Sequence, residues 1–96
     1  MARILSVDDS KSIRDLISHI LTQNNHEVIT ACDGDDAMKI VREIPPVDLA
    51  LIDVNMPVMN GVSLVSKLRR LEAYKFIPII MVTTETDEYR KQKPDP

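Results

Sequence analysis

Acidic side chains stand in this 96-residue sequence at the points where short apolar runs end. Asp8 and Asp9 follow the run over residues 4–7, Asp53 closes a second run, and a third run ends at Thr83. Oxygen-only donor sets with two carboxylates suit Mg²⁺, which keeps several water ligands and shares phosphate oxygens. A carboxylate held beside such an ion is a competent nucleophile toward a phosphoryl group. If these run ends lie together in space, the sequence predicts a magnesium site that supports aspartyl-phosphate chemistry.

Each of these acidic residues also has a purely structural interpretation. An aspartate after a strand is commonly a helix N-cap or a solvated turn residue, and Asp9 could cap a following helix. Three such residues at strand ends, each followed by a helix, favour the functional interpretation. A zinc site is not indicated, because His19 and His26 are seven residues apart and Cys32 is the only cysteine.

The elements that must position these residues follow an alternating pattern. Unbroken apolar runs predict four strands, and helical spacing of apolar residues predicts a helix in each interval; the strands are expected at 4–7, 27–31, 48–52 and 78–82. The predicted strands are continuous apolar runs and do not alternate between apolar and polar residues. This pattern indicates a parallel sheet covered by helices, a doubly wound α/β fold. In the flavodoxin-like order the first and third strands are neighbours, so Asp8, Asp9, Asp53 and Thr83 would emerge at one edge of the sheet.

Composition excludes several other classes of function. The chain has 12 Lys and Arg against 15 Asp and Glu, a net charge of −3, so neither a basic nucleic-acid surface nor a polybasic membrane anchor is expected. No apolar run approaches the roughly 20 residues of a membrane helix. The single cysteine cannot form an internal disulfide. We therefore expect a cytoplasmic domain that binds neither nucleic acid nor membrane.

Three segments together resemble a known family. They are the strings ILSVDDS at 4–10, LIDVNMPVMNG at 51–61 and IIMVTTE at 79–85. The sequence resembles the receiver domain of two-component response regulators, and is similar to single-domain chemotaxis regulators of the CheY type. The resemblance implies a flavodoxin-like (CheY-like) sheet in the order 2-1-3-4, truncated after the fourth strand. It places a truncated receiver domain at 1–90 and a tail at 91–96.

The resemblance also implies a role for each matching residue. Asp53 would be the phosphoacceptor, and Thr83 would be the switch hydroxyl that reaches the phosphoryl oxygen. Asn55 and Glu85 would tune dephosphorylation, with the Asn55 amide orienting an attacking water. We therefore expect a phosphorylated state that hydrolyses itself.

The metal ligands implied by the family are the three aspartates and one backbone group. Asp9 and Asp53 would bind Mg²⁺ directly, and Asp8 would hold it through water. The backbone carbonyl of Asn55 would complete the protein ligands.

One departure from the family concerns the C-terminal part. The Lys93-Pro94 pair imitates the family's Lys-Pro motif but comes too early and has no strand before it, so the catalytic lysine is not carried over. The fourth strand would then have an apolar open edge, which can pair with another chain. We expect a homodimer or an exchange of elements through this edge.

Three functions compete on these observations. The first is a phosphorelay receiver that accepts a phosphoryl group from a sensor histidine kinase and signals to a downstream target protein or flagellar motor component. Such a receiver is a switch and does not turn over a foreign substrate. The second is a truncated receiver that acts as a passive interaction module without phospho-switching. The third, a haloacid-dehalogenase-type phosphohydrolase, is disfavoured because that family has Asp-x-Asp at the nucleophile, whereas this chain has Asp53-Val54-Asn55.

Overall fold

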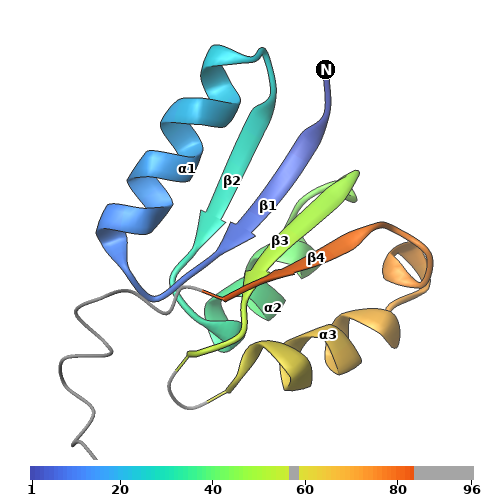
Figure 1. The fold of residues 1–96 in the computed structure, drawn as a ribbon. Helices are drawn as coiled ribbons and strands as arrows, with labels where there is room; N and C mark the ends of the chain where they lie inside the picture. Colours follow the sequence, from blue (N-terminus) through green and yellow to red (C-terminus); the bar gives the residue numbers. More distant parts are fainter. Residues whose placement is uncertain (57–58, 84–96) are drawn as a thin grey trace, which may run out of the picture.

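The computed structural model describes residues 1–56 and 59–83, which form a parallel sheet with helices on both of its faces (Figure 1). The elements in chain order are β1 (Arg3–Val7), α1 (Lys11–Gln23), β2 (Glu27–Ala31), α2 (Gly34–Glu43), β3 (Leu49–Asp53), α3 (Gly61–Arg69), the 3₁₀ turn η1 (Glu72–Tyr74) and β4 (Ile79–Val82). Helix α1 lies on one face of the sheet, and α2 and α3 lie on the other. Glu85 and the expected tail at 91–96 fall outside the described residues.

The sheet has the strand order β2-β1-β3-β4, and every neighbouring pair is parallel. This confirms the predicted doubly wound arrangement. Val7 of β1 is paired with Ile52 of β3, and Asp53 of β3 is paired with Val82 of β4. The carboxyl ends of β1, β3 and β4 therefore meet at one edge of the sheet.

A side chain caps the amino end of each of the three helices in the described residues. The acceptors are Ser10, Asp33 and Asn60, which receive hydrogen bonds from the backbone N–H groups of Ile13 at 3.3 Å, Asp36 at 2.8 Å and Ser63 at 2.9 Å. Such caps contribute about 0.5–2 kcal/mol each. Asp9 is not the cap of α1, because the Ser10 hydroxyl satisfies the free N–H group of that first turn, and the side chain of Asp9 remains available for another role.

The main core lies between the sheet and the two helices α2 and α3. Its buried members include Leu5, Val7, Ala50 and Ile52 from the central strands, Ala37, Met38 and Val41 from α2, and Leu64 and Leu68 from α3. Truncating a fully buried leucine of this kind to alanine costs about 2–5 kcal/mol. The core fixes β3 against α3, and so fixes the position of the residue that ends β3.

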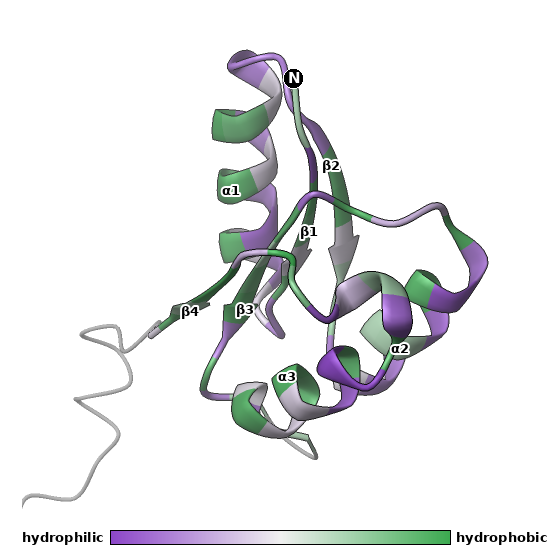
Figure 2. Ribbon diagram, turned by 90° about the vertical axis from the view of Figure 1, so that its right-hand side faces the viewer, coloured by the Kyte–Doolittle hydropathy of each residue, from purple (hydrophilic) through white to green (hydrophobic). Residues whose placement is uncertain are grey.

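The opposite face of the sheet is covered less completely. Helix α1 packs against β1 and β2 but contains no buried residue, and Leu16 and Ile20 remain 53% and 48% exposed. Strand β4 is hydrophobic along its length (Figure 2), and Ile80 is 50% exposed. Among the described residues, apolar side chains are therefore exposed on α1 and on β4.

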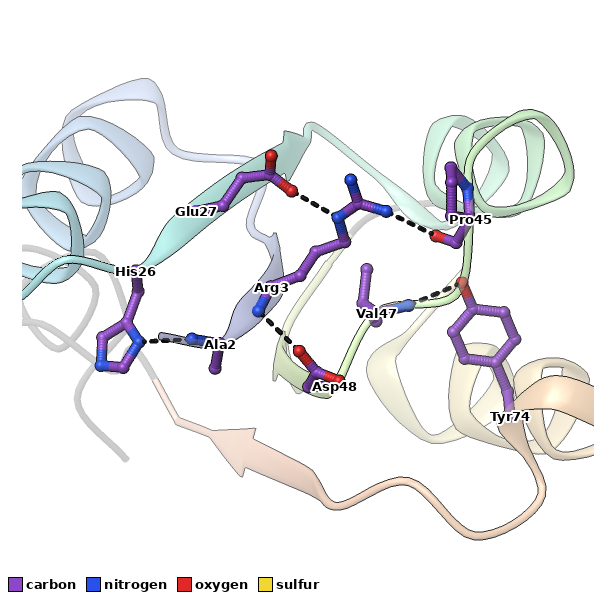
Figure 3. A network of polar contacts seen from close by, with 8 residues as sticks. All are labelled: Ala2, Arg3, His26, Glu27, Pro45, Val47, Asp48 and Tyr74. Atoms are coloured by element: carbon purple, nitrogen blue, oxygen red, sulfur yellow. Dashed lines mark hydrogen bonds and ion pairs between the residues drawn. The ribbon is translucent and has the colours of Figure 1, made fainter.

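Polar contacts tie the strands together at the edge opposite their carboxyl ends (Figure 3). The backbone N–H of Arg3 donates to Asp48 Oδ2 at 2.8 Å, and the Arg3 guanidinium forms an ion pair with Glu27. The N–H of Ala2 donates to His26 Nδ1 at 3.1 Å. These contacts join β1 to the segments that begin β2 and β3, and they support the register that aligns the carboxyl ends.

Candidate functional site

The register of β1 and β3 brings the predicted aspartates together. Val7 and Ile52 are paired, so the next residues along each strand, Asp8 and Asp53, lie side by side at the carboxyl edge. One carboxylate oxygen from each of Asp8, Asp9 and Asp53 lies within 4.8 Å of the other two. Asp8 is 2% exposed and Asp53 is 0% exposed, whereas Asp9 is exposed. The cluster thus has two buried carboxylates and one that faces solvent.

Local backbone structure holds the two buried carboxylates. The Asp8 carboxylate accepts a hydrogen bond from the backbone N–H of Ser10 at 2.8 Å, in the turn that leads into α1. The Asp53 carboxylate accepts one from the backbone N–H of Asn55 at 3.1 Å. Both groups therefore have defined orientations before any ligand binds.

Helix α3 approaches the backbone of Asp53 very closely. The N–H of Gly61 donates to the carbonyl of Val54 at 3.1 Å, and a Cβ atom on Gly61 would overlap the carbonyl oxygen of Asp53. On the other side, the N–H of Val54 donates to the carbonyl of Val82 at 3.0 Å. The end of β3 is thus fixed between α3 and β4.

Burial and like charges raise the pKa of Asp8. Desolvation is the largest cause, and the carboxylates of Asp53 and Asp9 add to it. The hydrogen bond from Ser10 and the positive charge of Arg14 act in the opposite direction. A cation bound at this site would offset the repulsion between the buried carboxylate and its two acidic neighbours.

Arg14 is a residue of this site that the sequence analysis missed. Its guanidinium donates to the backbone carbonyl of Asp8 at 2.7 Å from one turn into α1. The available signal was its spacing, because a side chain four residues after the Ser10 cap returns toward the amino end of the helix. Arg14 supplies positive charge beside the cluster and fixes the backbone of Asp8.

Three predicted site residues remain, and the described part of the chain includes two of them. Thr83 directly follows Val82, the partner of Asp53, so it lies at the same edge, and it is exposed. Asn55 is also exposed just beyond β3, whereas Glu85 lies outside the described residues. The roles predicted for these three residues stay predictions.

The donor set fits a hard divalent cation. Three carboxylates supply oxygen ligands only, and their close approach is favourable only if their charge is compensated. Within residues 1–56 and 59–83, this is also the one group of His, Cys, Asp or Glu side chains arranged to hold a metal ion.

Comparison with known proteins identifies the family. The profile of the response regulator receiver domain matches residues 4–93. The chain belongs to the response regulator receiver domain family. This confirms the resemblance inferred from the strings around Asp8, Asp53 and Thr83.

The receiver domain is similar to proteins of different overall size. The chemotaxis protein CheY homolog of Campylobacter jejuni is 42% identical over 84 residues, which are 86% of this chain and 65% of that protein. The protein-glutamate methylesterase/protein-glutamine glutaminase of Bacillus subtilis is 42% identical over 90 residues, which are 92% of this chain and 24% of that enzyme. This chain therefore matches less than two thirds of either relative's length, and the enzyme's named activity is not carried over with the similarity.

A solved structure supports the same fold. Chemotaxis protein CheY4 of Vibrio cholerae superimposes with a TM-score of 0.84 and 47% identity, covering 96% of this chain and 76% of the other. Among the residues that the structure describes, every helix is too short or too polar to cross a membrane. The chain is thus a receiver domain homologous to chemotaxis-type regulators.

Proposed function

We propose that this receiver domain accepts a phosphoryl group on Asp53 from a sensor histidine kinase. The observation that carries the proposal is the position of Asp53, a buried carboxylate at the carboxyl end of β3 with two further aspartates within 4.8 Å. In the transfer, an oxygen of Asp53 attacks phosphorus while the P–N bond of the phosphohistidine breaks. The imidazole nitrogen leaves with the electron pair and takes up a proton.

Mg²⁺ is the cofactor proposed for this site. Asp8, Asp9 and Asp53, with the backbone carbonyl of Asn55, would hold it. When bound, the ion neutralises negative charge on the carboxylates and on the incoming phosphoryl oxygens. Arg14 contributes positive charge from the protein itself and keeps the backbone of Asp8 in place.

We also propose roles after phosphorylation for Thr83, Asn55 and Glu85. Thr83, at the end of β4, would move its hydroxyl toward the phosphoryl group and so signal the phosphorylated state. Asn55 and Glu85 would set the rate of hydrolysis. The partners would be a kinase and a downstream target protein or flagellar motor component, and they would meet this domain in the cytoplasm. The chain would act as a switch rather than as a turnover enzyme.

Phosphorylation by a small donor tests the proposal without knowledge of the kinase. The chain is incubated with acetyl phosphate and Mg²⁺, and intact-mass spectrometry measures the addition of one phosphoryl group. We expect the addition in the wild type, its loss with EDTA, and its absence in Asp53→Asn. The matched control is Asp15→Asn, which neutralises an exposed aspartate on α1 and should leave the addition unchanged.

Failure of the wild type to gain mass would overturn the proposal. It would favour the second candidate, a receiver fold that binds its partners without a phospho-switch.

A further inference from the structure

A groove between α2 and α3 is lined by other residues than the three clustered aspartates. It encloses about 450 Å³. The two helices lie side by side on the same face of the sheet (Figures 1 and 2). Met38, Met59 and Leu71 give the groove an apolar floor, with Met38 buried and the other two partly buried. Methionine side chains adapt readily to the shape of a bound apolar group.

The rim of the groove is predominantly basic, although the chain as a whole is acidic. Four exposed cations line it, against two exposed acids; the cations are Lys39, Arg42, Lys67 and Arg70, and the acids are Asp35 and Glu43. The rim therefore carries a net charge of +2 (four minus two), whereas the whole chain carries −3. This local reversal of sign favours an anionic partner.

Side-chain pairing within the described part of the chain does not account for the rim cations. None of the four forms an ion pair or a side-chain hydrogen bond with another described residue. Neighbouring Arg69 differs, because its guanidinium donates to the backbone carbonyls of Tyr74 at 3.0 Å, Lys75 at 3.1 Å and Ile77 at 2.7 Å. Arg42 and Lys67 lie in the last turns of their helices, where they complement the helix dipole, but that position does not explain Lys39 in the middle of α2.

We propose that this groove docks an acidic, leucine-bearing segment of a partner protein. Apolar side chains at helical spacing would contact the methionine and leucine floor, and the partner's carboxylates would face the four rim cations. A nucleic acid would use the rim but not the floor, so the floor favours a peptide. The proposal goes beyond phosphorylation of Asp53 and does not depend on it.

The probe is a short fluorescent peptide of glutamate and leucine, with the leucines at helical spacing. Binding to the full chain is measured by fluorescence anisotropy, and ¹⁵N amide shifts locate the contact. We expect saturable binding with shifts concentrated in α2 and α3. A peptide with lysine in place of every glutamate should not bind.

Paired variants with equal charge changes test the location. Arg42→Gln with Arg70→Gln removes two rim cations and should weaken binding by about tenfold. Lys11→Gln with Lys75→Gln removes two exposed cations elsewhere and should change binding by less than about twofold. All four positions are exposed, so both double variants should keep the fold.

Three outcomes would overturn the proposal. The first is no saturable binding of the glutamate–leucine peptide. The second is equal weakening in both double variants, or amide shifts outside α2 and α3. The third is equal binding of oligothymidylate or of a peptide with serine in place of every leucine, which would make the rim a general polyanion surface without an apolar anchor.

Discussion

Asp8 is a buried carboxylate whose charge opposes folding in the absence of a cation. Burial, together with Asp53 and Asp9, raises its pKa, so the folded state binds a proton at Asp8 more tightly than the unfolded state does. Above the raised pKa the charged form therefore costs stability. That cost disappears as the pH falls from the raised pKa to the ordinary aspartate value.

The variant Asp8→Asn should consequently be more stable than the wild type at neutral pH without divalent cations. Asparagine retains the oxygen that accepts from Ser10 N–H, and it removes the charge whose burial opposes folding. Urea unfolding in EDTA measures the difference, which should shrink as the pH is lowered through the raised pKa. Asp15→Asn, at an exposed position on α1 outside the cluster, is the control with little effect. A less stable Asp8→Asn variant would contradict this electrostatic account.

Asn55 should control the lifetime of the phosphorylated state. Its exposed side chain two residues after Asp53 is available to orient a water molecule for attack. Asn55→Arg should lengthen the lifetime several-fold, because the larger side chain displaces that water. The lifetime is measured by intact-mass spectrometry as the loss of the phosphoryl group over time. Asn24→Arg, at the exposed end of α1, is the control. An unchanged decay rate would remove Asn55 from the mechanism.

At the scale of elements, the start of α3 determines where β3 delivers Asp53. Gly61→Ala should destabilise the fold by about 1–3 kcal/mol, because the added Cβ meets the backbone carbonyl of Asp53, which cannot move freely. Gly34→Ala is a matched control at the first position of α2, where the nearest neighbour is the flexible side chain of Met59. Chemical denaturation should give Gly61→Ala a clearly lower free energy of unfolding than Gly34→Ala. Equal stabilities would show that the contact between α3 and β3 is not restrictive.

The elements also show what the sequence could and could not predict. The apolar runs predicted the four strands, and the rule for ligand sites in parallel sheets predicted that Asp8, Asp9 and Asp53 would meet. The register that pairs Val7 with Ile52 depends on tertiary packing and was not readable in advance. The contact between Arg14 and the Asp8 carbonyl is local, but it was missed because a basic residue on an amphipathic helix normally indicates only a solvated face.

At the scale of the whole molecule, self-association through β4 stays a prediction that solution measurements can test. In the described residues β4 is paired with β3 alone, and its exposed Ile80 makes the edge apolar. Sedimentation should detect a concentration-dependent dimer, and Ile80→Lys should shift it toward monomer. Val62→Lys, on exposed α3 surface, should not. A wild type that is monomeric at every concentration would exclude this prediction.

The proposed function requires that the carboxyl edge of the sheet present Asp53 to a phosphoryl group beside a divalent cation held by the neighbouring aspartates. The most direct measurement traps the phosphorylated chain with borohydride, which reduces an aspartyl-phosphate to homoserine, and locates the change by tandem mass spectrometry. The account predicts modification at Asp53 only, and only when Mg²⁺ is present during phosphorylation. Modification at Asp8 or Asp9 instead, or modification of Asp53 that is indifferent to divalent cations, would contradict it.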